Sequence, residues 1–403
     1  MTSIFKDLEP APRDPILALS LDARAAKEPK ADLIIGAYRD EEGRPYPLQV
    51  VRKAEQRLIS MGLDREYLPM FGHGPFIEEA TKMAYGDSVP MERVVGAQGL
   101  SGTGSLSLGA HLLCRVLPAD TAVYVSTPTW PNHYAVFRAA GLKNIREYRY
   151  YDPKTRRLDF EGLIEDLKAA PAGSIVVLHA CAHNPTGVDP TKEQWQKIAD
   201  VCKSGRLTPF FDSAYQGYAT GSLVNDVYSV RLFAKMGLEI VLAQSFAKNM
   251  GLYCERVGVC SVAVSDASKT AAIRACFESI ARSFYTTPPA HGARVAHLVL
   301  SDPELRKEWE EELGKMVKRV QAMRRAVYDG LKKRGTPGTW EHVIDQIGMF
   351  SYLGLTEEQC LKLREKRVFV LNSGRANMAA LTHASVDVVV KAIDEVVRET
   401  QGK

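Results

Sequence analysis

The sequence lacks the features that would place it in several specialised classes. Its longest apolar runs, such as 175–178 and 240–243, have the length of a strand, whereas a membrane span needs about 20 apolar residues. Its 7 cysteines are odd in number and form no Cys-x-x-Cys pair, so neither a disulfide framework nor a zinc site is expected. The 52 Lys and Arg and the 48 Asp and Glu leave a net charge of +4, too small and dispersed for a nucleic-acid partner. We therefore predict no metal, no nucleic-acid partner and no membrane span.

The two ends of the sequence carry no recognisable targeting signal. Residues 1–10 have no apolar signal-peptide core, and Asp7, Glu9 and Asp14 come too early for an acid-poor transit peptide. The last residues, 401–403, do not match a retention or peroxisomal address. We therefore expect a cytoplasmic protein.

The middle of the chain alternates short apolar runs with amphipathic stretches. This alternation is typical of βα units and of a mostly parallel sheet. The runs that predict strands are 93–97, 122–126, 145–150, 174–179, 208–211, 240–245 and 257–264. Helical patterns such as 191–203 and 227–236 lie between them. We predict an α/β protein whose large domain has a mostly parallel sheet flanked by helices.

The last third of the chain has a different pattern. Residues 303–335 carry apolar side chains at three- and four-residue steps, which predicts a helix about 45 Å long. A coiled coil is the alternative, but no second heptad stretch exists, so we favour a helix that bridges two domains. Strand-like runs at 349–353 and 367–371 and a helix at 385–400, with Ser385 as its N-cap, follow.

These patterns predict two domains, because a single core stops growing near about 250–300 residues and the chain has 403. The predicted parts are an N-terminal arm at 1–12 that contacts a partner subunit, a large domain at 46–312, and a smaller α+β domain at 13–45 and 313–403.

Chemically active side chains follow five of the predicted strands. The segments that follow the strands are 99–104, 128–133, 179–187, 212–215 and 245–249. In an open parallel sheet, ligands bind beyond the carboxyl ends of the strands. We therefore predict one ligand site where hydroxyls, an indole, histidines, an amide, an acid, a phenol and a lysine meet.

The segment 99–104, Gly-Leu-Ser-Gly-Thr-Gly, opens a helical pattern and suits a phosphate group. Backbone N–H groups and the helix dipole attract an anion, and Ser101 and Thr103 add hydroxyl donors. A plain tight turn is an equal alternative. The segment lacks the glycine order of a dinucleotide site and the lysine of a P-loop, which disfavours a nicotinamide dehydrogenase.

Lys248 directly follows a buried-strand pattern and precedes Gly251. Most lysines are solvated surface charges, but a lysine held at a sheet edge can have a lowered pKa and form a Schiff base. Asp212 at another strand end could pair with a pyridinium nitrogen, or only cap a turn. Trp130 could stack on a ring or pack in the core.

Taken together, these residues make the sequence resemble the class I, fold-type I pyridoxal-phosphate enzymes, in the branch of the animal-type aspartate aminotransferases. The segments that carry the resemblance are 35–39, 101–104, 179–190, 211–217, 244–251 and 371–375, and the likeness covers essentially the whole chain. It implies transamination between L-aspartate and 2-oxoglutarate, giving oxaloacetate and L-glutamate, by a ping-pong route through a Lys248 aldimine and pyridoxamine phosphate. It also implies a homodimer with sites shared between subunits, acting on dicarboxylic amino and 2-oxo acids.

The resemblance implies a role for each matched residue. The catalytic residues would be Lys248, Asp212 and Tyr215, of which Lys248 holds pyridoxal phosphate and Asp212 pairs with its pyridine nitrogen. The other cofactor contacts would be Ser101, Gly102, Thr103, Trp130, Asn184, Ser245 and Arg256, with Tyr67 from the neighbouring subunit. The substrate contacts would be Gly36, Trp130, Asn184 and Arg375, with Arg282 reaching the distal carboxylate from the neighbouring subunit. His133 and His179 would support Asp212.

Two stretches depart from the family pattern. Thr286 and Thr287 stand where the family often has Ser-Asn, and a phosphate contact by Thr286 stays possible. Ile34 and Ile35 stand where the family usually has Gly-Val, and could narrow the entrance or strengthen the seal over the substrate.

Three other functions stay open. A broad-range aminotransferase of the same fold would also act on aromatic amino acids. A pyridoxal-phosphate lyase or decarboxylase is disfavoured because Arg282 with Arg375 suits a substrate with two carboxylates. A regulatory protein that binds the cofactor as an effector is disfavoured because no segment is long enough for a DNA-binding domain.

Overall fold

The computed structural model describes residues 3–10 and 15–400, so the predicted arm at 1–12 lies partly outside the described residues. Seven strands form the central sheet in the order β2-β10-β9-β8-β7-β3-β4. Their bounds are β2 Val94–Leu100, β3 Val123–Thr127, β4 Ile145–Arg149, β7 Ile175–His179, β8 Thr208–Ser213, β9 Ile240–Ser245 and β10 Val257–Ala263. All run parallel except β10, which is antiparallel to both of its neighbours. The prediction of a mostly parallel sheet is confirmed.

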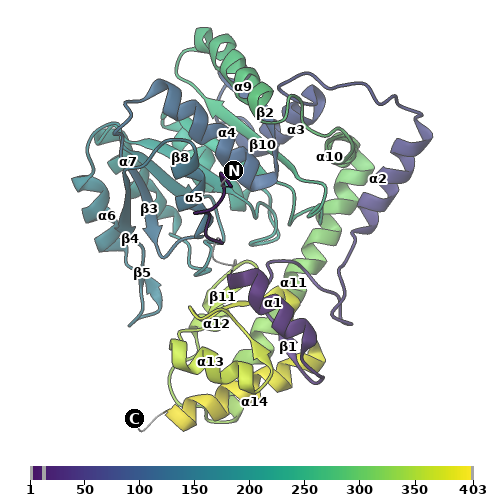
Figure 1. Ribbon diagram of the computed structural model, residues 1–403, viewed down its shortest axis with the longest axis vertical. Helices are drawn as coiled ribbons and strands as arrows, with labels where there is room; N and C mark the ends of the chain where they lie inside the picture. The colour runs from purple at the N-terminus through teal and green to yellow at the C-terminus, as the bar shows by residue number, and fades with distance from the viewer. Residues whose placement is uncertain (1–2, 11–14, 401–403) are drawn as a thin grey trace.

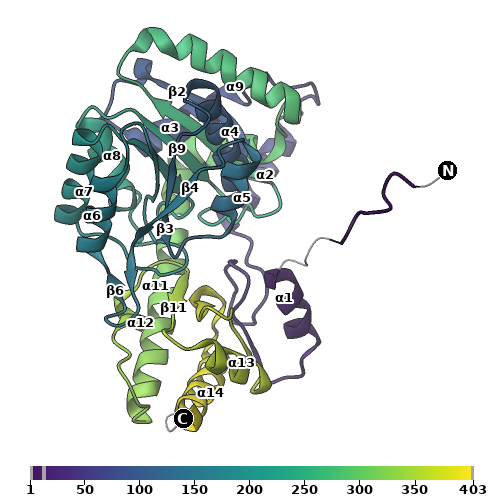
Figure 2. The same cartoon turned by 60° about the vertical axis from the view of Figure 1, so that its left-hand side comes forward.

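Helices cover both faces of this sheet, as Figures 1 and 2 show. The core on one face is shared with α4 Ser101–Val116, α5 Asn132–Ala139 and α9 Thr270–Phe284. The core on the other face is shared with α3 Gly74–Tyr85, α6 Phe160–Ala169, α7 Lys192–Ser204 and α8 Tyr228–Lys235. Because both faces are covered, the inner strands read as apolar runs, and every residue of β7 is buried.

The long helix α11, Pro303–Lys333, confirms the predicted helix in the last third of the chain. It starts where Asp302 caps it, since the Asp302 carboxylate accepts hydrogen bonds from the backbone N–H groups of Glu304 (2.9 Å) and Leu305 (3.0 Å). One end of α11 packs on α2 Gln49–Ser60 and α10 His291–Ser301, and the other end on α12 His342–Asp345 and α14 His383–Thr400. The helix therefore joins the two ends of the molecule (Figure 1).

Glu312 on α11 also caps the start of α2. Its carboxylate accepts hydrogen bonds from the Tyr46 hydroxyl at 2.6 Å and from the backbone N–H groups of Gln49 at 2.9 Å and Val50 at 3.2 Å. The N-cap residue of α2, Leu48, has no side-chain acceptor of its own. A residue more than 250 positions away thus satisfies the free N–H groups of this helix start.

The lower part of the molecule in Figure 1 contains α1 and the C-terminal elements. These elements are α1 Pro15–Ala25, β1 Ala31–Asp32, β11 Phe350–Tyr352, α13 Glu357–Glu365, β12 Val368–Phe369 and β13 Arg375–Asn377. Strand β1 pairs with β12 in parallel, and β11 pairs with β13 antiparallel. A small hairpin, β5 Tyr151–Asp152 and β6 Arg157–Leu158, lies beyond β4.

The expected N-cap at Ser385 is wrong. Helix α14 begins at His383, and the Thr382 hydroxyl accepts a hydrogen bond from the backbone N–H of Ser385 at 3.1 Å. The Ser385 hydroxyl in turn accepts from the backbone N–H of Thr382 at 2.9 Å. Thr382 is therefore the cap, and Ser385 closes a reciprocal pair of bonds with it.

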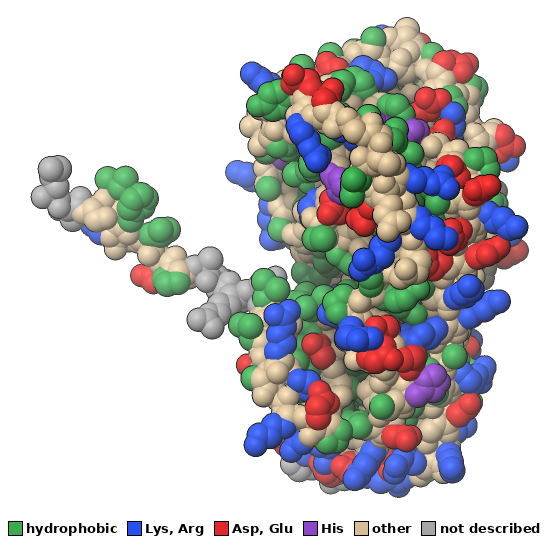
Figure 3. Space-filling model, turned by 90° about the vertical axis from the view of Figure 1, so that its right-hand side faces the viewer, with side chains coloured by type: hydrophobic (Ala, Val, Ile, Leu, Met, Phe, Trp, Pro, Cys, Tyr) green, Lys and Arg blue, Asp and Glu red, His purple; other side chains and the backbone are tan. Residues whose placement is uncertain are grey.

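Residues 3–10 stand away from the body of the molecule and carry hydrophobic side chains (Figures 2 and 3). Among them Ile4, Phe5 and Leu8 are exposed. Within the described residues, no helix has both the length and the apolar character needed to span a bilayer.

Candidate active site

A pocket of about 340 Å³ opens at the carboxyl edge of the central sheet. Its lining residues are Ile16, Ile35, Gly36, Ser101, Gly102, Thr103, Trp130, Asn184, Asp212, Ala214, Tyr215, Ser245, Ala247, Lys248, Tyr253, Arg256, Phe350 and Arg375. All of the site residues predicted from the sequence lie here except Tyr67, His133, His179 and Arg282. Strand ends far apart in the sequence meet because parallel strands all end at the same edge.

Lys248 lies in the turn after β9. This turn is held by Trp309 of α11, whose indole Nε1 donates a hydrogen bond to the carbonyl of Asn249 at 2.7 Å. Burial lowers the pKa of the Lys248 amine to about 8; the charge of Asp212 opposes this shift, and the charges of Arg256 and Arg375 add to it. A neutral amine, which is the nucleophilic and basic form, is therefore available near neutral pH.

Asp212, at the end of β8, is buried beneath the pocket. Nε2 of His133 donates a hydrogen bond to it at 3.1 Å, and Nδ1 of His133 lies 2.8 Å from the Thr129 hydroxyl. Burial alone would raise the pKa of Asp212, but the hydrogen bond from His133 and electrostatic interactions with the neighbouring imidazoles and the Lys248 amine lower it overall. The pocket therefore has a fixed negative charge, suited to a cationic ring nitrogen.

His179 lies beside His133, with the two ring centroids 5.2 Å apart. Neither of its ring nitrogens has a hydrogen-bond partner among the described residues. His133, His179 and Asp212 have potential metal-ligating atoms within 4.8 Å of one another. However, Nε2 of His133 carries the proton that it donates to Asp212, so this group resembles a hydrogen-bonded support for the carboxylate rather than a set of free metal ligands.

The start of α4 forms a cradle for an anion. Ser101, Gly102 and Thr103 make its first turn, so their N–H groups have no partner within the helix. The Ser101 hydroxyl lies 2.9 Å from the Ser245 hydroxyl, and Arg256 completes the lining. Strand β2 continues to Leu100, so the glycine-rich segment is a helix start and not the alternative tight turn.

Two of these residues have backbone angles in the left-handed region, with φ of 60° at Ser101 and 54° at Arg256. Such angles cost roughly 1–3 kcal/mol each and persist where the surroundings impose them, often at functional sites. The two residues face each other, since the backbone N–H of Ser101 donates to the carbonyl of Arg256 at 3.1 Å.

Arg375 supplies a cation to the lining of the same pocket. Its Nη2 donates to the carbonyl of Ile34 at 2.9 Å and its Nη1 to Oδ1 of Asn184 at 3.4 Å, while its Nε has no partner among the described residues. Its guanidinium lies 4.1 Å from the centre of the Phe350 ring. No carboxylate of the described residues pairs with it, and burial lowers its pKa to about 10. This arrangement suits an incoming carboxylate.

Tyr215 and Asn184 face the same space. Burial raises the pKa of the Tyr215 hydroxyl well above its ordinary value, and the Asp212 charge adds to that shift. The hydroxyl is therefore a neutral donor at physiological pH.

Ile34 and Ile35, which stand where the family usually has Gly-Val, have different positions. Ile34 is fully buried among Leu19, Ala23 and Phe369, so it does not narrow the pocket. Ile35 does line it.

Sequence reasoning missed several lining residues, among them Ile16, Tyr253 and Phe350. Tyr253 lies five residues after Lys248, in the segment between β9 and β10, and its hydroxyl accepts a hydrogen bond from the backbone N–H of Tyr38 at 3.0 Å. Its place between Lys248 and Arg256 was a usable signal. Ile16 and Phe350 are brought in from distant segments, and no local pattern marks them.

Tyr67 and Arg282 lie outside the pocket. Tyr67 is 81% exposed, in the segment between α2 and α3, and Arg282 is exposed in the last turn of α9. Thr286, four residues after Arg282, has a φ of 64°.

Comparison with known proteins agrees with this geometry. Residues 28–393 match the family model described as aminotransferase class I and II. The chain belongs to this family. It is 45% identical over 405 residues to the cytoplasmic aspartate aminotransferase of Dictyostelium discoideum, covering 100% of this chain and 92% of that one.

Solved structures of aminotransferases superpose closely on this chain, which confirms the predicted fold type I. An aspartate aminotransferase from Trypanosoma cruzi has 65% identity and a TM-score of 0.92, covering 99% of this chain and 100% of that one. The broad specificity aminotransferase from Leishmania mexicana has 56% identity and a TM-score of 0.96, covering 98% of each chain. An aromatic-amino-acid aminotransferase from Burkholderia pseudomallei, covalently bound to pyridoxal phosphate, has 41% identity and a TM-score of 0.95, covering 98% and 100%. The family and this last structure imply pyridoxal phosphate as the cofactor.

Proposed function

We propose that this aminotransferase transfers an amino group between L-aspartate and 2-oxoglutarate, giving oxaloacetate and L-glutamate. The observation that carries the proposal is the single pocket in which Lys248, with a pKa near 8, faces both the Asp212 anion and the unneutralised Arg375 cation. The name aspartate aminotransferase, shared by the Dictyostelium and Trypanosoma relatives, supports the choice of substrates.

The residues of the pocket fit pyridoxal phosphate. The start of α4, with Ser245 and Arg256, would take the phosphate, Asp212 the ring nitrogen, Tyr215 and Asn184 the phenolic oxygen, and Trp130 the ring face. The geometry that supports this fit is the anion cradle at the start of α4 and the buried Asp212 carboxylate, which line the same pocket. When bound, this cofactor supplies an electron sink that stabilises negative charge on the substrate α-carbon.

The chain's own groups would do the binding and the proton transfer. Arg375 would bind the α-carboxylate with two parallel hydrogen bonds, which a lysine could not form equally well. The neutral Nζ of Lys248 would move the proton from the substrate α-carbon to the exocyclic carbon of the cofactor, and would move a proton in the reverse direction when the second substrate reacts. Asp212, kept ionised by His133, would hold a proton on the cofactor's ring nitrogen.

A homodimer would complete the site. Tyr67 and Arg282 are exposed and lie away from their own pocket, which supports a role in the pocket of a second copy. The apolar side chains on residues 3–10 support a docking arm, as proposed for residues 1–12. We also propose that the chain folds into a large domain, 46–312, and a small domain formed by 13–45 and 313–403. The small domain would close over bound substrate. We propose a cytoplasmic location for the protein.

Subunit complementation tests the shared site and the chemistry together. Lys248→Ala and Arg282→Leu each disable a different half of the site. After the two inactive variants are unfolded together and refolded, half of the dimers carry one intact site of two, so about a quarter of wild-type activity on aspartate should return. No recovery from two well-folded variants contradicts the shared site.

A second candidate is a broad-range enzyme that also accepts aromatic amino acids. Ile16, Ile35 and Phe350 give the pocket an apolar wall, and the Leishmania mexicana neighbour is described as having broad specificity. A panel of aspartate, glutamate, phenylalanine and tyrosine separates the two: kcat/KM for the aromatic substrates within tenfold of that for aspartate favours the broad-range enzyme.

A further inference from the structure

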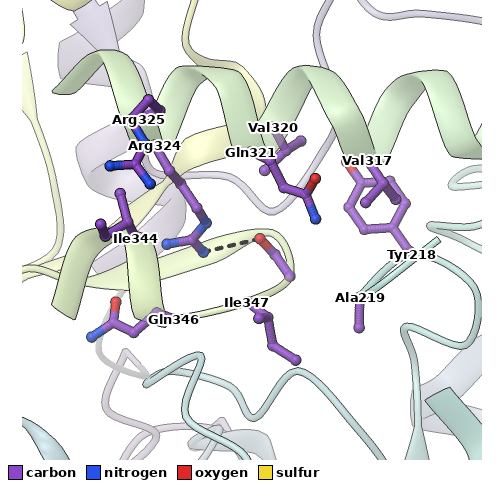
Figure 4. Close-up of a pocket in the computed structure, with 11 residues that line it drawn as sticks. Tyr218, Ala219, Val317, Val320, Gln321, Arg324, Arg325, Ile344, Gln346 and Ile347 are labelled. Atoms are coloured by element: carbon purple, nitrogen blue, oxygen red, sulfur yellow. Dashed lines mark hydrogen bonds between the residues drawn. The ribbon is translucent and has the colours of Figure 1, made fainter. Parts of the chain in front are cut away.

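A second cavity, of about 260 Å³, lies between α11 and the turn that leads from α12 to β11 (Figure 4). Arg324 extends from α11 across this space toward the turn, while its neighbour Arg325 is exposed. Arg324 is only 2% exposed. Within residues 3–10 and 15–400, no carboxylate pairs with its guanidinium.

The hydrogen bonds of Arg324 go to backbone carbonyl groups. Its Nη1 donates to Val343 at 3.0 Å, and its Nη2 donates to Gly348 at 3.0 Å and to Phe350. These carbonyls belong to α12, the turn and the first residue of β11. A buried cation is costly unless its N–H groups are bonded, so the three carbonyls and the guanidinium depend on one another.

The far side of the turn is held by the segment that carries Asn184. The backbone N–H of Ile347 donates to the carbonyl of Gly187 at 2.8 Å. Gly348 has a φ of 80°, and a Cβ at that position would lie 2.4 Å from the Cβ of Ala182. The turn is therefore fixed between Arg324 on one side and the 182–187 segment on the other.

Phe350 connects the turn to Arg375. The Phe350 ring lies 4.1 Å from the Arg375 guanidinium, and a Cβ on Gly36 would lie 2.7 Å from the tip of the ring. The strands are coupled as well, since Tyr352 of β11 pairs with Arg375 of β13. A shift of Phe350 would therefore move or release the guanidinium that lines the pocket.

We propose that Arg324 is a positioning residue, which fixes the turn at 346–350 so that Phe350 keeps the Arg375 guanidinium directed at the substrate carboxylate. The inference rests on the proposed function, because it takes carboxylate binding by Arg375 as given. Arg324 itself does not line the active-site pocket and acts through Phe350.

The test compares Arg324→Met, Arg324→Lys and the matched control Arg325→Met in the full-length protein with its cofactor. For each variant, kcat and KM are measured with aspartate and 2-oxoglutarate, together with the cofactor absorbance and hydrogen–deuterium exchange of a peptide covering 346–353. Arg324→Met should raise KM for both substrates about tenfold or more, reduce kcat less, and leave the cofactor absorbance unchanged. The exchange of the peptide should rise, Arg324→Lys should recover part of the loss, and Arg325→Met should stay within about twofold of wild type.

Two results would overturn the proposal. One is a folded Arg324→Met whose KM and peptide exchange match wild type. The other is weaker cofactor binding together with a lower kcat and a higher KM, all changed to a similar extent, which indicates a general structural role. If Arg324→Met does not fold, Arg324→Lys is read by the same criteria. Failure of the wild-type protein to convert aspartate would instead count against the proposed function, and the peptide exchange would still show whether Arg324 fixes the turn.

Discussion

Nε2 of His133 donates a hydrogen bond to Oδ2 of Asp212 at 3.1 Å, in a part of the molecule from which water is nearly excluded. The histidine is itself oriented by the Thr129 hydroxyl, 2.8 Å from its other ring nitrogen. This chain of contacts keeps a carboxylate ionised despite its burial, because the hydrogen bond and the adjacent charges outweigh the cost of desolvation.

Removing the negative charge of Asp212 should lower the rate of the reaction much more than it lowers the stability of the protein. Asp212→Asn keeps the size of the side chain but removes the anion, so kcat should fall by at least about 100-fold. Steady-state kinetics with aspartate measure the effect, and Asp200→Asn on the exposed face of α7 serves as the control. A kcat within tenfold of wild type would show that the ring-nitrogen partner lies elsewhere.

Replacing the lysine should abolish turnover and leave a cofactor site. Lys248→Ala removes the amine proposed to transfer the proton, whereas the anion cradle at Ser101 and Arg256 remains. We expect no measurable turnover with aspartate and retained binding of pyridoxal phosphate by fluorescence titration, with Lys269→Ala unchanged in both. Near-normal turnover of Lys248→Ala would refute the proposed mechanism.

The lowered pKa of Lys248 predicts how cofactor uptake depends on pH. Only the neutral amine attacks an aldehyde, and the neutral form becomes the major form above the pKa. In the cofactor-free protein, the rate of covalent uptake of pyridoxal phosphate should therefore rise with pH and reach half of its maximum near pH 8, instead of near the ordinary lysine value of 10.5. Borohydride trapping at a series of pH values measures it. A half-maximum above pH 10 would mean that the amine is not desolvated as the structure indicates.

Arg282 is proposed to select substrates with a second carboxylate. Arg282→Leu should lower kcat/KM for aspartate by about 100-fold or more while changing kcat/KM for a monocarboxylic amino acid by less than about tenfold, because only the distal contact is lost. Arg274→Leu, two turns earlier on α9, is the matched control. Equal losses of kcat/KM for both kinds of substrate would show that Arg282 does not bind the distal carboxylate.

Glu312 provides a test of the fold apart from catalysis. Glu312→Gln weakens the three hydrogen bonds that cap α2 and bind Tyr46, and should lower the free energy of unfolding by about 1–3 kcal/mol. Denaturant unfolding measures the change. The adjacent, exposed Glu311→Gln should have almost no effect, and an equal loss in the two variants would contradict the capping role.

Much of the site was predictable because it follows from topology. Once the sheet is mostly parallel, the residues after each strand must share one edge, and this places Ser101, Asp212 and Lys248 together. The single antiparallel strand β10 was not predicted. The segment 246–256 before it contains no crossover helix, so the chain can only return antiparallel.

Other features depend on contacts that no local pattern encodes. Phe350 reaches Arg375 only because β11 pairs with β13, about 25 residues away. Ile34 looked like part of the pocket entrance, but it packs into a separate apolar cluster. The sequence predicted Ser385 as the N-cap of the last helix, but the backbone path makes Thr382 the cap, and Ser385 bonds back to it.

We propose above that the pocket around Lys248 exchanges an amino group with a dicarboxylic amino acid. The most direct measurement is the absorption spectrum of the purified protein, loaded with pyridoxal phosphate, before and after aspartate is added alone. We expect the bound-aldehyde band to move to shorter wavelength as the cofactor takes the amino group, and 2-oxoglutarate to restore it. A cofactor band that ignores aspartate, or no band after the cofactor is supplied, would contradict the proposal.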